Sequence, residues 1–178
     1  LCYEAGDHPR LNETIMMLSK RRAQLKEALG AMVRKGSEYA MDDAALPDDA
    51  TRLALIEALR AVSEGKMFVE VERARLTRKL AQMLEAEGKM VDARKIMIET
   101  VVETLGGMGK REKTDFILEQ VRLCLDTDEF VRAQIMARKI NVKVFKDDEI
   151  EDLKLRFYKL IVRYHLHEHT WMEIYRAY

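Results

Sequence analysis

The chain has 178 residues, and its 31 Lys and Arg side chains balance 31 Asp and Glu, so its formal net charge is zero. This balance argues against a general nucleic-acid binder, which needs surplus basic side chains to displace counterions from phosphates. No apolar run approaches the roughly 20 residues needed to span a bilayer, and no secretory signal is visible. We therefore expect neither nucleic acid nor membrane as a partner.

The composition favours helices throughout. Charged residues make up 35% of the chain and aromatic residues 7%, and there are only two prolines and eight glycines. Strand-like alternation of apolar and polar residues is absent, so we predict an all-α protein. Cys2 and Cys124 lie far apart and in no metal-binding spacing, which indicates reduced thiols.

The N-terminal third has the least regular pattern. The first residue is not methionine, and residues 1–5 resemble the end of a helix, so we expect a fragment truncated at both ends. Residues 11–33 predict one long helix with an apolar face of Ile15, Leu18, Leu25 and Leu29. A second helix is predicted to start at Leu46-Pro47-Asp48, with the proline in its first turn, and to end near Ser63-Glu64-Gly65.

Further along the chain, a helix, a short turn and a second helix recur about every 40 residues, the spacing of a helical solenoid. In the first clear unit, Gly88 is placed to end the first helix as a left-handed cap. The apolar positions of its two helices are Leu76, Leu80, Met83 and Leu84, then Met90, Ala93, Ile96, Met97 and Val101.

The next two units follow the same plan. Gly106-Gly107-Met108-Gly109 is a turn between units, and Thr127-Asp128 is predicted to supply a turn and a side-chain N-cap. Asp147-Asp148-Glu149 suits the start of the third unit. The apolar faces are Ile117, Val121, Cys124 and Leu125, then Phe130, Ala133, Ile135, Met136 and Ile140, then Leu153, Phe157, Leu160, Ile161 and Tyr164, and finally Trp171, Ile174 and Tyr175.

These patterns predict a single helical-repeat domain over residues 1–178, an all-α, right-handed α-solenoid of antiparallel helix pairs. We expect Phe157, Tyr164, Trp171 and Tyr175 to pack between the last helices. Their partial exposure would make the fragment prone to self-association, because capping repeats are missing.

A metal site is the first chemical possibility to weigh, at His165, His167 and His169. A spacing of two residues places neighbours about 200° apart on a helix, so three ligands could converge only if the chain turned there. Structural zinc also normally needs four convergent ligands. We therefore predict no metal site.

Other chemical signals have ordinary structural explanations. The basic runs Lys20-Arg21-Arg22 and Lys110-Arg111-Glu112-Lys113 favour solvated helix faces, then contacts with an acidic partner, and only then nucleic acid. Glu70 with Arg73, and Glu72 with Arg75, have the spacing of helix-stabilising pairs. We expect Met83, Met97, Met136 and Cys124 to lie in the core. The glycine turn lacks the lysine and the preceding strand of a phosphate-binding loop. We predict no catalytic or cofactor-binding residues, no cofactor and no small-molecule substrate.

Several long segments resemble one known family in the same order. These are Asn12 to Arg22, Val69 to Thr77, Arg132 to Ile135 and, as the most diagnostic, Phe116 to Leu125. The sequence is similar in these segments, and over nearly its whole length, to the PCI-domain subunits of the 26S proteasome lid.

The resemblance implies a non-catalytic scaffold of the proteasome regulatory particle, which supports ubiquitin-dependent degradation in the cytoplasm and nucleus. It implies a helical-repeat arm that precedes a winged-helix PCI module and contacts other lid subunits, including the lid deubiquitinase, and the core particle. The PCI module is expected to lie outside residues 1–178.

Two alternatives stay open at the level of sequence. One is the related PCI subunit of the COP9 signalosome, which shares the arm-plus-PCI plan. The other is a free-standing repeat adaptor that captures peptide tails. Such an adaptor needs a clamp of Lys, Arg and Asn for a carboxylate, and the repeat pattern does not assemble one. A metal hydrolase built on the histidine cluster is the least favoured.

Overall fold

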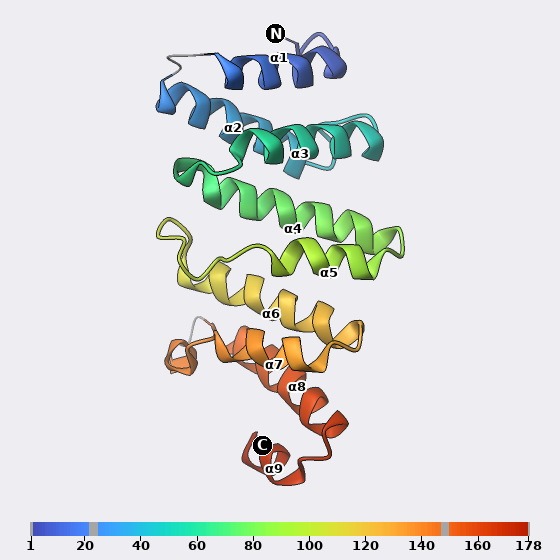
Figure 1. Ribbon diagram of the computed structural model, residues 1–178, viewed down its shortest axis with the longest axis vertical. Helices are drawn as coiled ribbons and strands as arrows, with labels where there is room; N and C mark the ends of the chain where they lie inside the picture. Colours follow the sequence, from blue (N-terminus) through green and yellow to red (C-terminus); the bar gives the residue numbers. More distant parts are fainter. Residues whose placement is uncertain (1, 22–24, 147–149, 178) are drawn as a thin grey trace. The chain divides into compact units, whose positions relative to one another are not determined.

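The computed structural model describes residues 2–21, 25–146 and 150–177, and the described residues form helices joined by turns (Figure 1). The all-α helical repeat predicted from the sequence is thus confirmed, whereas its right-handed sense stays a prediction. The chain divides into two compact units, residues 1–83 and 84–178. The helices are α1 (His8–Lys20), α2 (Lys26–Met41), α3 (Asp49–Ser63), η1 (Met67–Val69), α4 (Glu70–Ala86), α5 (Met90–Ile98), α6 (Lys110–Asp126), α7 (Phe130–Arg138), η2 (Val142–Lys146), α8 (Glu151–His167) and α9 (Trp171–Ala177).

In the first unit, the predicted single helix over residues 11–33 is wrong. Two helices, α1 and α2, replace it, and both pack against α3. Arg21 and Leu25 have extended backbone conformations at the break, where Leu25 is 71% exposed. The break lets both helices bury apolar faces on α3, which a continuous helix could not do. The part of this segment at residues 22–24, including Arg22, lies outside the described residues.

The first unit has a tightly packed core between α2 and α3. Val33, Ile56 and Leu59 are fully buried there, and a methyl group on Gly36 would lie 2.9 Å from a Leu59 Cδ atom. Asp48 caps α3 by accepting a hydrogen bond from the Thr51 amide at 2.6 Å. Pro47 therefore precedes the cap rather than occupying the predicted first turn, while the predicted end of the helix near Ser63 is confirmed.

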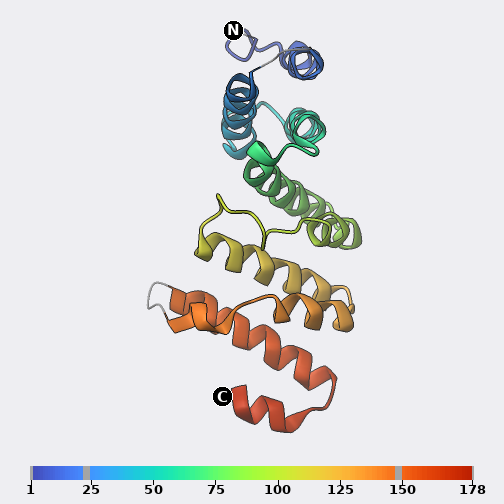
Figure 2. The same ribbon diagram turned by 60° about the vertical axis from the view of Figure 1, so that its left-hand side comes forward.

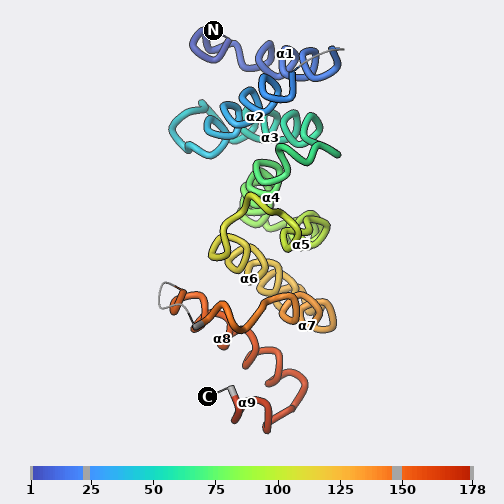
Figure 3. Tube along the Cα trace, turned by 90° about the vertical axis from the view of Figure 1, so that its left-hand side faces the viewer, coloured from blue at the N-terminus to red at the C-terminus, as the bar shows by residue number. Residues whose placement is uncertain are grey.

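The repeat spacing is confirmed by the helix boundaries. The starts of α4 and α6, Glu70 and Lys110, are 40 residues apart, as are those of α5 and α7, Met90 and Phe130. The starts of α6 and α8 differ by 41. Each first helix of a pair has 17 residues. In the second unit, α5 packs on α6, α6 on α7 and α8, and α8 on α9 (Figures 2 and 3).

A common turn joins the two helices in each of the pairs α4–α5, α6–α7 and α8–α9. The amides of Lys89, Glu129 and Thr170 each donate to a carbonyl five residues earlier, at 2.8 to 3.0 Å. The residue before each donor, Gly88, Asp128 or His169, has a left-handed backbone with φ of +78°, +58° or +55°. This is the Schellman ending of a helix, and it confirms the predicted role of Gly88. The predicted side-chain N-cap at Thr127-Asp128 is wrong, because Thr127 donates back to the Leu123 carbonyl and Glu129 is the N-cap residue.

Helix α6 forms the centre of the second unit's core. Nine of its residues are buried, including the predicted Ile117, Val121, Cys124 and Leu125. The amide group of Gln120 donates to the carbonyls of Met97 and Thr100, at 2.6 and 2.9 Å, and so satisfies the C-terminal end of α5.

Two apolar positions were placed wrongly by the pattern. Helix α5 ends at Ile98, so Val101 lies in the following loop and is 51% exposed, while Val102 is buried in its place. Ile135 is also 51% exposed, on the outer face of α7. Periodicity identifies a helix face only to within about one residue, because 3.6 residues per turn leaves boundary positions ambiguous.

The expected aromatic packing at the last helices is only half correct. Phe157 is buried and its ring lies 5.2 Å from that of Phe145, and Tyr164 is half-buried. Trp171 and Tyr175, however, are 63% and 79% exposed. The seven-residue α9 packs on α8, but these two rings stay largely exposed and do not join the core.

Candidate interaction surface

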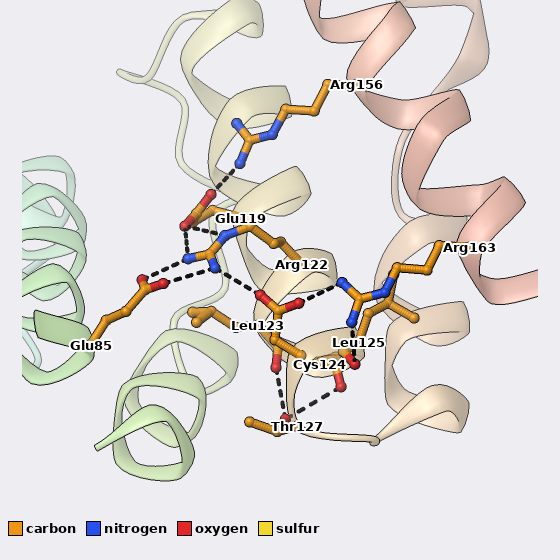
Figure 4. A network of polar contacts seen from close by, with 10 residues as sticks. Glu85, Glu119, Arg122, Leu123, Cys124, Leu125, Thr127, Arg156 and Arg163 are labelled. Atoms are coloured by element: carbon orange, nitrogen blue, oxygen red, sulfur yellow. Dashed lines mark hydrogen bonds and ion pairs between the residues drawn. The ribbon is translucent and has the colours of Figure 1, made fainter. Parts of the chain in front are cut away.

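A network of arginines and acids connects successive helix pairs of the second unit, with Arg122 of α6 at its centre (Figure 4). The Arg122 guanidinium donates to both carboxylate oxygens of Glu85, in the last turn of α4, at 2.9 and 2.6 Å. It also donates to Asp126 at 2.8 Å, and its Nε donates to Glu119 at 2.9 Å. One half-buried guanidinium therefore holds three carboxylates from two helices.

Arg163 of α8 repeats this arrangement one helix pair later. It lies 41 residues after Arg122, which is the offset between α6 and α8. Arg163 pairs with Asp126 and donates to the Leu125 carbonyl at 3.1 Å. Both arginines thus reach back 37 residues to an acid in the last turn of the preceding 17-residue helix.

Arg156 lies two turns before Arg163 on the same face of α8 and extends the network towards the start of that helix. It donates to Asp115 at 2.7 Å and also pairs with Glu119. Near the helix starts, Arg111 and Asp152 form a two-fold hydrogen-bonded pair at 2.9 and 2.6 Å. We call the set of Glu85, Asp115, Glu119, Arg122, Asp126, Arg156 and Arg163 the arginine ladder.

The electrostatics of the ladder favour its fully charged form. Burial alone would raise the pKa of Glu119, but hydrogen bonding and charge from Arg122 and Arg156 outweigh it and lower the pKa. Burial would lower the pKa of Arg122, and the hydrogen bonds to Glu119 and Glu85 instead raise it. A carboxylate held ionised by two arginines is poorly suited to proton transfer, so the ladder is a structural device.

The histidines examined for metal binding have three separate environments. His165 Nδ1 lies 2.7 Å from the Thr170 hydroxyl, the His167 ring stacks on Phe130 with centroids 3.4 Å apart, and His169 forms the left-handed turn. Within the described residues, no group of three or more His, Cys, Asp or Glu side chains could hold a metal ion.

The remaining sequence signals also have definite places. Met97, Met136 and Cys124 are buried as predicted, whereas Met83 is half-buried. Burial raises the pKa of the Cys124 thiol to about 11, so at neutral pH it is protonated and a weak nucleophile. Gly106 to Gly109 forms the predicted turn between helix pairs.

Some side chains of the charged runs are exposed, as predicted, and others form ion pairs. Lys20 and Arg21 are exposed, while Arg111 forms the ion pair with Asp152 rather than facing solvent alone. Arg73 lies 3.8 Å from Glu64. The acids of residues 147–149, expected to start the third unit, lie outside the described residues. Among the helices of the described residues, none has the length and apolarity required to cross a bilayer.

The segment singled out as most diagnostic, Phe116 to Leu125, lies within α6. It contains Glu119 and Arg122 of the arginine ladder, and Gln120, which caps α5. These polar contacts join residues that are 20 or more positions apart in the sequence. The sequence analysis missed these contacts. The pattern of charges along a helix predicts ion pairs between residues three or four positions apart, and it contains no information about a partner 37 residues away.

Comparison with known proteins agrees with the resemblance found in the sequence. The family model described as PSMD12/CSN4, N-terminal, matches residues 1–178. The chain is 45% identical over 201 residues to the 26S proteasome non-ATPase regulatory subunit 12 homolog A of Arabidopsis thaliana. It is 44% identical over 178 residues to the 26S proteasome non-ATPase regulatory subunit 12 of Dictyostelium discoideum, and 42% over 164 residues to the 26S proteasome regulatory subunit RPN5 of Saccharomyces cerevisiae.

The first two alignments include 100% of this chain and the third 92%, but they include only 45%, 39% and 37% of those relatives. The chain thus spans less than half the length of the curated relatives it matches. The matched length leaves no part of residues 1–178 outside the family model. The chain belongs to the PSMD12/CSN4 N-terminal family.

Proposed function

We propose that this chain is a non-catalytic scaffold segment of a regulatory subunit of the 26S proteasome lid. The observation that carries the proposal is the 44 to 45% identity, over the full chain, to proteins named as non-ATPase regulatory subunit 12. The family description also includes CSN4, so the related signalosome subunit is the alternative. The proteasome is favoured because the relatives named above are all proteasome subunits.

The physical organisation of the second unit suits a scaffold. Helix pairs that each bury a core against the next leave long outer surfaces for partner proteins. The arginine ladder ties each helix pair to the preceding one through charge-assisted hydrogen bonds, which resist sliding of one pair on another. A surface held in fixed register can support stable contacts with large partner subunits.

The proposed partners are other proteasome subunits, in particular lid subunits, the lid deubiquitinase and the core particle. The proposed sites of action are the cytoplasm and the nucleus. No enzymatic activity is proposed, because the most perturbed ionisable groups of the second unit are locked in structural ion pairs or, like the Cys124 thiol, held neutral by burial. The scaffold is proposed to support ubiquitin-dependent degradation through protein contacts alone.

The test is affinity purification of the full-length protein that contains this segment, followed by mass spectrometry of its partners. A matched form that lacks residues 1–178 shows which partners need the segment. Recovery of proteasome lid subunits with the full-length protein, and loss of a subset with the shortened form, is the expected result. Recovery of signalosome subunits, or of no large complex, would contradict the proposal.

A further inference from the structure

A small cavity in the second unit combines positive charge with an apolar floor. It has a volume of about 150 Å³ and lies where the end of α7, η2 and the first turns of α6 meet. Its apolar side chains are Ile117, Ile140 and Val144. This volume is well above the roughly 15 Å³ that one water molecule needs, so the cavity has room for an aliphatic side chain.

Three lysines and one acid surround this floor. Lys139 Nζ lies 2.6 Å from Glu103 Oε1, and Lys113 Nζ donates to the Glu103 carbonyl at 3.4 Å. Lys110 also lines the cavity and is exposed. Three ammonium groups against one carboxylate leave the lining side chains with a surplus of two positive charges, so a guest should be anionic.

Glu103 adds a second requirement. Lys139 outweighs the effect of burial and lowers the pKa of Glu103, so the carboxylate is ionised at neutral pH. Its other oxygen, Oε2, is buried and accepts no hydrogen bond from the described residues. A buried acceptor without a donor is costly. A guest that brings an N–H group beside its anionic group would supply the missing donor.

We propose that this cavity binds the C-terminal carboxylate of a partner polypeptide that ends in an aliphatic residue. The carboxylate pairs with Lys110 and Lys113, and the aliphatic side chain packs on Ile117 and Ile140. The last peptide N–H faces Glu103. An acidic side chain within a chain would bring charge without an aliphatic group on the same residue, so the combination of charge and apolar floor selects a chain terminus.

The probe is the peptide acetyl-Gly-Leu with a free carboxylate, titrated into the 178-residue chain with labelled isoleucine methyl groups. We expect saturable NMR shifts at the Ile117 and Ile140 methyls, and none with the same peptide carrying a C-terminal amide. Lys110→Gln and Lys113→Gln should each weaken binding by about tenfold, because each removes a charge-assisted hydrogen bond. Lys154→Gln, an exposed lysine of α8 outside the cavity, is the matched control and should leave binding unchanged.

Three outcomes of the comparison between ligands would overturn the proposal. They are equal binding of the amidated peptide, equal binding of acetyl-Gly-Gly, and shifts of the same size with acetate or inorganic phosphate, which would make this a general anion site. Absence of any methyl shift up to the solubility of the peptide would also overturn it. If Lys113→Gln perturbs the fold, the binding affinity of the Lys110→Gln variant tests the proposal instead, because Lys110 is exposed and its replacement should leave the fold intact. The experiment uses no other proteasome subunit, so its outcome is independent of the proposed scaffold function.

Discussion

Gly88 and Asp128 occupy equivalent positions in successive helix pairs, 40 residues apart, and both have left-handed backbones, with φ of +78° and +58°. Glycine adopts this conformation without strain, whereas a residue with a Cβ atom meets steric resistance there. The turn around Asp128 is nonetheless formed by the same backbone hydrogen bond as the turn around Gly88, from the amide of the next residue to a carbonyl five residues earlier. The shared turn therefore carries strain at Asp128 that is absent at Gly88.

Replacement of Asp128 by glycine should stabilise the chain. Relief of the left-handed strain is expected to raise the free energy of unfolding by about 0.5 to 1 kcal/mol, after subtraction of the extra freedom that glycine has in the unfolded chain. Urea denaturation followed by circular dichroism measures the change. The reciprocal variant, Gly88→Asp, should lose a similar amount. A gain from both substitutions would show that backbone strain does not control this turn.

Removal of the central guanidinium of the arginine ladder should be costly. Arg122→Met leaves Glu85 and Glu119 half-buried without their main partner, so we expect a loss of about 2 kcal/mol in the free energy of unfolding. Arg163 is 49% exposed, and Arg163→Met should cost only about 0.5 kcal/mol. A double-mutant cycle between Arg122 and Glu85 measures the coupling directly. Equal effects of the two arginine substitutions would show that burial does not set the strength of the ladder.

The ladder also predicts a pH dependence of stability. The pKa of Glu119 is lower in the folded chain, because Arg122 and Arg156 outweigh the effect of burial. Its stabilising contribution is therefore complete above the ordinary glutamate value of 4.5 and is lost as the pH falls through the lower folded value. Glu119→Gln should reduce the fall in unfolding free energy between pH 6 and pH 3, measured by urea titration at each pH. An unchanged slope in this variant would assign the acid sensitivity to other groups.

Two glycines of α2 should respond to alanine in opposite directions. A methyl group at Gly36 would lie 2.9 Å from the fully buried Leu59, so Gly36→Ala should lower the unfolding free energy by about 1 kcal/mol or more, despite its better helix propensity. At Gly30 the nearest atom is the flexible end of Arg34, at 3.3 Å. Gly30→Ala should therefore be neutral or stabilising by up to about 1 kcal/mol. Thermal unfolding of both variants checks the sign, and a stabilised Gly36→Ala variant would contradict the packing described.

The repeat was predictable from the sequence because its signals are local. Apolar spacing and the single glycine at Gly88 are enough to place a helix, its cap and the next helix. Asp128 was misread as part of an N-cap, because aspartate is favoured at N-caps and also tolerates left-handed turns better than most residues that have a Cβ atom. The break between α1 and α2 was missed because no glycine or proline marks it and apolar spacing continues from Leu18 to Leu25.

The polar contacts between helix pairs were not predictable in the same way. Arg122 and Glu85 lie 37 residues apart, and their meeting depends on the register of two helices. The cavity beside Lys113 depends on residues from three segments and was likewise missed: a carboxylate clamp of Lys, Arg and Asn was considered, and the repeat pattern did not assemble one. Tertiary register is a property of packing, which single-sequence periodicity does not encode.

Helix α6 buries nine side chains, contacts α5, α7 and α8, and carries Arg122. Its amide protons should consequently be the slowest of the second unit to exchange with deuterium, because their exposure requires separation of several neighbours at once. Helix α9, by contrast, has seven residues and packs on α8. Opening of this unit should therefore begin at α9 and reach α6 last.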